Sequence, residues 1–172
     1  ENLKNCINND LANNYGNLCQ RVFSFIKKNC SNKIPKKDKL IDQDKKLLNE
    51  LKNNVPNLIK FMNAQNLNEY IKLVVSFSFD ANKYFNDSEP WSLKNKDTIR
   101  MQTILYTISE QIRNISILLN PIIPKATGKI LDLMNIEKKN RSISSIIRSD
   151  SVSTEKELGD LEILFKKIEN DN

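Results

Sequence analysis

The sequence of 172 residues fits one ordinary domain, which is long enough to bury its own core. Its hydrophobic share of 39%, with only 3 Gly and 5 Pro, excludes a disordered chain and a turn-rich all-β chain and favours helices. The formal net charge of +6 suits a polyanionic partner, although a solvated basic surface would give the same value.

Several kinds of chemistry are excluded by the residues that the sequence lacks. Without histidine, no imidazole acid, base or metal ligand exists, and there is no glycine-rich phosphate-binding loop. The cysteines include no C-x-x-C pair, which favours reduced thiols in a cytoplasmic protein over a disulfide framework or a zinc site. We therefore expect no catalytic residue, no metal site and no cofactor within this chain.

The sequence also lacks the features of an exported or membrane-spanning chain. No apolar run approaches the roughly 20 residues that a membrane span needs, so we expect no membrane partner. The sequence starts at Glu1 rather than Met, and a helical pattern is already under way by Ile7. We therefore expect a fragment of a larger chain.

The first predicted helix covers residues 2–28. Its apolar residues fall on one face of a helix that advances about 100° per residue, and they are Ile7, Leu11, Leu18, Val22 and Phe25. Residues 29–39, which are rich in lysine, have no period and predict a loop.

The next apolar patterns predict two further helices. The first of them carries its stripe on Leu48, Leu51, Val55, Leu58 and Met62. Pro56 lies inside this pattern and predicts a kink or a break just before it, because proline removes a backbone hydrogen bond. The second covers residues 67–85, where the spacing of three and four continues.

The fourth predicted helix has a strict heptad, formed by Met101, Leu105, Ile108, Ile112, Ile115 and Leu119. Such a heptad is either a core stripe or an oligomerisation seam, and the other stripes of this chain need its cover. Pro121 ends the helix, and a shorter fifth helix follows to about Met134.

Together these helices predict an all-α fold, an antiparallel bundle of four to five helices, because each apolar stripe can be buried only against another. We assign residues 1–136 to the bundle, the polar residues 137–157 to a linker and residues 158–172 to a C-terminal tail that packs back on the bundle. A helical bundle alone supports unrelated functions.

A polar ridge on the first helix is one candidate site. Asn13, Asn17 and Arg21 lie four residues apart and therefore on adjoining turns of one face. Amides and a guanidinium fork provide the donors and acceptors that bind the edges of unstacked bases. The same spacing also fits the ordinary polar flank of a bundle helix.

The single tryptophan is the second candidate. Trp91 follows Pro90 at the turn before the fourth helix, where a proline fits the first helical position. An exposed ring at such a turn can stack on splayed single-stranded bases. The alternative is that Trp91 closes the end of the core.

Four stretches of the sequence resemble the anticodon-binding domain of methionyl-tRNA synthetases. They are DLANNYGNLCQR at residues 10–21, ANKYFNDSEPWSL at 81–93, LLNPIIP at 118–124 and ILFKKIE at 163–169. Lys166 departs from the pattern, because the family commonly has a proline there. The resemblance covers nearly the whole chain, and its combination of N-L-x-x-R with P-W is more particular to methionine than to other class I synthetases.

The resemblance implies a role for each candidate residue. Asn17 and Arg21 would contact bases of a CAU anticodon in tRNA, and Trp91 would stack on the first of them, with Asn13 and Pro90 as supporting positions. The parent enzyme would join methionine to its tRNA using ATP, through a catalytic domain whose HIGH and KMSKS motifs are absent here. We expect a monomer, because the additional dimerisation module of some family members is not seen.

Two other hypotheses remain open at this point. The chain could be the anticodon-binding domain of a class I synthetase for valine, isoleucine, leucine or cysteine, which share the bundle. It could instead be a bundle that binds protein through the heptad of the fourth helix.

Overall fold

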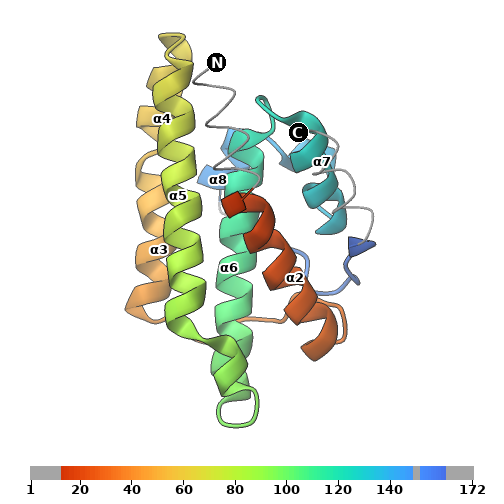
Figure 1. Cartoon of the computed structure of the whole chain (residues 1–172). Helices are drawn as coiled ribbons and strands as arrows, with labels where there is room; N and C mark the ends of the chain where they lie inside the picture. The colour runs from red at the N-terminus through yellow and green to blue at the C-terminus, as the bar shows by residue number, and fades with distance from the viewer. Residues whose placement is uncertain (1–12, 149–151, 162–172) are drawn as a thin grey trace.

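The computed structural model describes residues 13–148 and 152–161. These residues form the helices α2 (Gly16–Asn29), α3 (Asp42–Asn53), α4 (Val55–Asn63), α5 (Leu67–Ser88), α6 (Thr98–Leu119), α7 (Pro124–Leu133) and α8 (Ile143–Ile147), with short 3-10 helices η2 (Pro90–Leu93) and η3 (Lys138–Asn140). The predicted all-α antiparallel bundle is confirmed (Figure 1). Within the described ranges, no helix is both long and apolar enough to cross a membrane.

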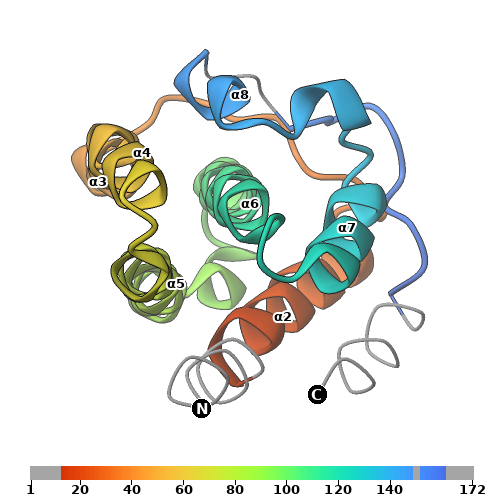
Figure 2. The same ribbon diagram turned by 90° about the horizontal axis from the view of Figure 1, so that it is seen from above.

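Helix α6 is the centre of the bundle, and the other helices surround it in the view of Figure 2. Its heptad residues Met101, Leu105, Ile108, Ile112, Ile115 and Leu119 are each at most 2% exposed. The heptad is therefore a core stripe, covered by α5 and its other neighbours within the same chain. No seam for a second chain is left on these residues.

The predicted first helix is confirmed where the structure describes it. Helix α2 buries Leu18 and Val22 against the bundle, and Phe25 packs on the core while half-buried. The earlier part of that prediction, with Ile7 and Leu11, lies outside the described residues.

The predicted break before Pro56 is also confirmed. Helix α3 ends at Asn53 and α4 begins at Val55, with Asn54 between them. Pro56 therefore lies in the first turn of α4, where the missing N–H would have had no helical partner.

The polar stretch 137–157, which we predicted as a linker, holds η3 and α8 and contacts the bundle. Ile146 of α8 is fully buried, and Val152 is 4% exposed. One short turn carries too few apolar residues to show a helical period, so the sequence pattern did not indicate it.

The beginning of the predicted tail lies against the bundle. Leu158 and Leu161 are each 5% exposed, and the Leu158 N–H donates to the Asn32 carbonyl at 2.8 Å. Residues 162–172, the remainder of the predicted tail, lie outside the described part of the chain.

A buried ion pair on α6 holds the returning chain. Arg113, 1% exposed, donates to the Glu110 carboxylate. The other Glu110 oxygen accepts the Val152 N–H at 3.0 Å. Either charge would be costly to bury alone, and their pairing offsets part of that cost.

A second charged cluster fixes the start of α3. Asp44 is fully buried and receives both Arg100 terminal nitrogens, at 2.7 and 2.9 Å. It also accepts from the Tyr84 hydroxyl at 2.5 Å and from the Ile41 N–H at 3.0 Å. Burial would raise the Asp44 pKa, but the hydrogen bonds from Arg100 and Tyr84 hold it below its ordinary value. Asp44 thereby joins α3, α5 and α6.

Candidate nucleic-acid interface

An open hollow of about 640 Å³ lies between α5 on one side and α2, with the residues just before it, on the other. Its lining is dominated by amide side chains and consists of Asn13, Asn14, Asn17, Gln20, Arg21, Phe79, Asn82 and Asn86. Amides both donate and accept hydrogen bonds, which is what the edges of unpaired bases require.

A second open hollow of about 270 Å³ adjoins the first and reaches η2. It is lined by Arg21, Ser24, Phe25, Lys28, Asn29, Phe85 and Trp91. Arg21 lines both hollows, so the two form one surface, which we call the α2–α5 groove. The first hollow offers mainly hydrogen bonds, and the second adds aromatic rings and a lysine.

Arg21 stands at the junction of the two hollows. Its Nη2 donates to Asn86 Oδ1 at 2.8 Å. Its Cζ lies 5.1 Å from the centroid of the Phe85 ring and 5.9 Å from that of the Trp91 ring. One amide and two ring faces therefore fix the guanidinium, while the residue stays exposed to a ligand.

Trp91 presents an open ring at the end of the groove. Its side chain is 44% exposed, and it makes a T-shaped contact with Phe85, with ring centroids 5.6 Å apart and planes at 71°. The ring therefore keeps surface free for stacking, and the core-closing alternative accounts for only part of it.

The turn before Trp91 sets the direction of that ring. Glu89 ends α5 in the left-handed region, with φ of 45°, which non-glycine residues adopt at a cost. The Glu89 carbonyl accepts the Ser92 N–H at 2.9 Å and the Ser92 hydroxyl at 2.7 Å. Pro90 is buried beneath this turn and begins η2. Pro90 thus supports the position of Trp91 without lining either hollow.

The structure brings most of the predicted site residues together. Asn13, Asn17 and Arg21 line the first hollow, and Arg21 and Trp91 line the second. Asn17 is exposed, and its Nδ2 donates to the Asn13 carbonyl at 2.5 Å. The amide of Asn17 is thereby held along the helix, with its side chain on the groove.

Sequence reasoning missed the wall that α5 contributes. Phe79, Asn82 and Asn86 line the first hollow, and they lie three and four residues apart on one face of α5. From the sequence, this spacing indicates only one face of a helix. The packing of α5 beside α2 is what identifies these residues as part of a site.

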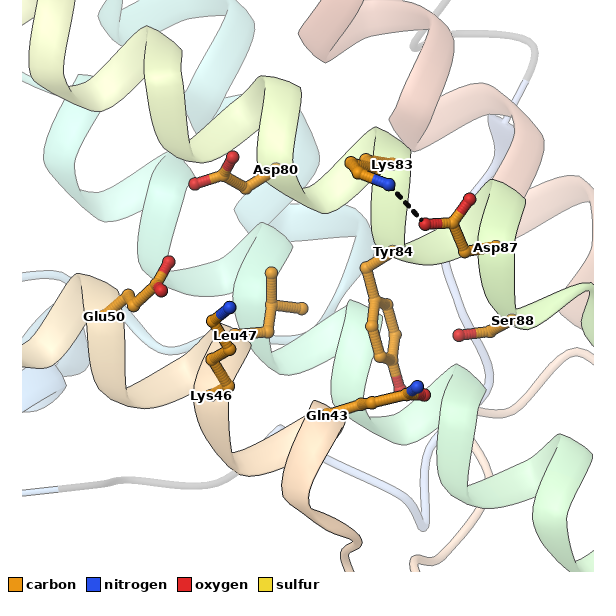
Figure 3. A pocket seen from close by; sticks show the side chains of 9 residues that line it. All are labelled: Gln43, Lys46, Leu47, Glu50, Asp80, Lys83, Tyr84, Asp87 and Ser88. Carbon is orange, nitrogen blue, oxygen red and sulfur yellow. Dashed lines mark hydrogen bonds and ion pairs between the residues drawn. The ribbon is translucent and has the colours of Figure 1, made fainter.

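A third hollow, of about 400 Å³, lies between α3 and α5 and has a different character (Figure 3). Its charges are mixed: Lys83 is paired with Asp87 at 2.7 Å, and Glu50 and Asp80 face the same space. Burial and the neighbouring Glu50 raise the Asp80 pKa. These carboxylates would repel phosphates, so this hollow does not suit a nucleic acid.

Fold and groove together define a class of protein: an all-helical domain whose groove combines amides, a fixed guanidinium and an open aromatic ring, the chemistry of single-stranded RNA binders. The comparisons with known proteins specify the class further. A family model described as "Anticodon binding domain of methionyl tRNA ligase" matches residues 34–172. The chain therefore belongs to the family of methionyl-tRNA ligase anticodon-binding domains.

Relatives and solved structures agree with this assignment. The chain is 34% identical to the methionine–tRNA ligase of Brucella suis over 149 residues, 87% of this chain and 29% of that protein. It is 31% identical to that of Rickettsia felis over 173 residues, 99% of this chain and 34% of that protein. The free methionyl-tRNA synthetase of Mycobacterium tuberculosis superposes with a TM-score of 0.84 at 30% identity, over 91% of this chain and 32% of that one.

The matches differ in which of the candidate site residues they cover. The family match includes Pro90 and Trp91 but begins after Arg21, whereas the Rickettsia match spans nearly the entire chain. The chain spans less than two thirds of the length of its relatives: 29% of the Brucella protein and 34% of the Rickettsia protein.

Proposed function

We propose that this domain binds the anticodon loop of a methionine tRNA and recognises its CAU anticodon through the α2–α5 groove. The observation that carries the proposal is the junction of Asn17 and Arg21 on α2 with Trp91 on η2, which two separate stretches of chain bring to one surface. Membership of the anticodon-binding family supplies the kind of ligand. The groove supplies the chemistry that such a ligand needs.

Each residue has a distinct role in this proposal. Trp91 stacks on the first anticodon base, because its ring is open and every base has a π-face. Asn17 and Arg21 bond base edges, for which an amide and a planar fork of donors are suited. Asn13 supports Asn17, because its backbone carbonyl accepts a hydrogen bond from the Asn17 amide. Pro90 supports Trp91, because it is buried beneath the turn that positions the ring.

Lysines beside the groove supply the part of the affinity that does not depend on sequence. Lys28 lines the second hollow, and Lys94 and Lys96 are exposed just after η2. Their charges attract the phosphate backbone and release its counterions, so binding should weaken as salt is added.

The proposal extends to the larger chain that the relatives imply. A catalytic domain of the same chain would join methionine to the tRNA with ATP, and this domain would contribute recognition and no catalysis. We also propose a monomer in the cytoplasm. The free thiols of Cys19 and Cys30 accord with a reducing compartment.

A specific observation argues against each of the two rival hypotheses. A protein-binding bundle would use the α6 heptad, which lies in the core. Another class I synthetase would share the fold, but the family match and the relatives are those of methionine.

Binding of a CAU stem-loop at two salt concentrations, against a stem-loop with one anticodon substitution, tests the proposal. We expect salt-sensitive binding that weakens by about 1–3 kcal/mol on substitution. Equal binding of both RNAs would show that the domain binds RNA through its basic surface alone, without reading the anticodon. Tighter binding of the anticodon of another class I synthetase would assign the domain to the synthetase for that amino acid instead of methionine.

A further inference from the structure

Phe79 of α5 is an exposed aromatic residue that none of the roles above explains. Its side chain is 52% exposed, more than that of Trp91 at 44%. Exposing a phenyl ring to water is unfavourable, and a ring that a ligand covers regains that free energy. Phe79 lines the first hollow together with Asn17 and Arg21.

The wall around Phe79 is polar and fixed in place. Asn82 Nδ2 donates to the Ser78 carbonyl and to the Asn14 carbonyl, each at 3.2 Å. The Ser78 hydroxyl donates to Asn14 Oδ1 at 3.1 Å, which ties α5 to the residues just before α2. The Phe79 ring therefore projects from a part of α5 that hydrogen bonds to Asn14 hold in place, and it lies beside the other amide side chains that line the first hollow.

We propose that Phe79 is a second stacking surface, which packs against the middle base of the anticodon while Trp91 packs against the first. This inference rests on the proposed function and deepens it. Arg21 lines both hollows, so a base on Phe79 and a base on Trp91 would occupy neighbouring compartments on either side of one guanidinium. Neighbouring nucleotides of an unstacked loop fill such compartments in turn.

The surroundings favour a base over a protein surface as the cover for Phe79. A protein partner would need a contiguous apolar patch with a polar rim. The other residues that line the first hollow are amides and Arg21, so Phe79 is an isolated ring in a polar compartment. A flat aromatic base with hydrogen-bonding edges matches both features.

The experiment compares Phe79→Ala and Phe79→Tyr in binding to a CAU stem-loop, an RNA with an abasic middle anticodon position and one with an abasic first position. We expect Phe79→Ala to weaken binding of the intact RNA roughly 5-fold or more, at the lower end of base stacking on an aromatic ring. Phe79→Tyr, which keeps the ring, should bind as the parent chain does. With the middle base absent, Phe79→Ala should have no further effect, whereas with the first base absent it should keep its full effect.

Ile59→Ala on α4 is the matched control, because this exposed apolar side chain, 38% exposed, lies outside both hollows. If Phe79→Ala matches Ile59→Ala while Trp91→Ala still weakens binding, the second stacking surface is wrong and the anticodon proposal stands. If Trp91→Ala is silent as well, the anticodon proposal itself fails. If Phe79→Ala still weakens binding of the RNA that lacks the middle base, Phe79 does not stack on the middle base, and that assignment is wrong. Thermal melts of each variant identify any change in folding.

Discussion

The guanidinium of Arg21 in α2 lies over the indole of Trp91 in η2, with Cζ 5.9 Å from the ring centroid. Asn86 holds the same guanidinium from α5 through a hydrogen bond of 2.8 Å. The stacking residue and the hydrogen-bonding residue are thus already in contact in the free protein. Little ordering is needed when RNA arrives, which favours affinity.

Trp91→Ala should weaken binding of a CAU stem-loop by about 1–3 kcal/mol, because the base loses its stacking surface. The free energy of unfolding should fall by only about 1 kcal/mol, the value of one aromatic edge contact. Fluorescence anisotropy with labelled RNA and thermal denaturation measure the two quantities. A large loss of stability with unchanged affinity would make Trp91 a core residue instead.

Arg21→Lys should weaken binding by about 1–3 kcal/mol, because the charge remains but the planar fork is lost. Its binding should keep the salt dependence of the parent chain. Lys28→Ala is the comparison: it should weaken binding of every anticodon sequence alike and lower the slope of log K against log salt by about 0.7. If both variants behave alike, Arg21 acts as a point charge and reads no base.

Asp44→Asn should lower the free energy of unfolding by roughly 2–3 kcal/mol, because Arg100 and Tyr84 lose a fully buried partner. Asp42→Asn, in the exposed first turn of the same helix, should change it by no more than about 0.5 kcal/mol. Urea denaturation of both variants measures the difference. Equal stabilities would show that the cluster is dispensable.

The same carboxylate predicts how stability depends on pH. The folded-state pKa of Asp44 is depressed, so the folded protein binds this proton less readily than the unfolded chain. Its contribution is complete above about pH 4 and is lost as the pH falls through the folded pKa. Asp44→Asn should therefore flatten the acid limb of the stability curve. An unchanged acid limb would locate the titrating group elsewhere.

Glu89→Gly should raise the free energy of unfolding by about 0.5–1 kcal/mol, because glycine adopts the left-handed region without strain. Ser76→Gly, at an exposed interior position of α5, should lower it by a similar amount. Opposite signs in thermal melts would support the strained turn before Trp91. Two destabilising changes would argue that Glu89 makes a contact that outweighs its strain.

The sequence predicted the bundle well because its helices are long and periodic. The α6 heptad and the break before Pro56 follow from spacing and from the chemistry of proline, and both are local properties of the chain. Helix α8 was missed, because one turn shows no period and its burial depends on long-range packing against α6.

The candidate site was predicted in part for the same reason. The ridge of Asn13, Asn17 and Arg21 is visible as spacing within one helix. The opposite wall of the groove, with Phe79 and Asn86, depends on which helix packs beside α2, and no local sequence pattern predicts that packing. The burial of Asp44 could not be foreseen either, because Arg100 and Tyr84 come from distant helices.

Trp91 is the only tryptophan of the chain, so its fluorescence reports directly on the central claim. We would titrate the protein with a CAU stem-loop and with one that lacks the first anticodon base, and record indole emission and anisotropy together. The account predicts that the intact RNA quenches Trp91 as the base stacks on its ring, and that the abasic RNA binds more weakly with little quenching. Tight binding of the intact RNA that leaves the Trp91 emission unchanged would contradict it.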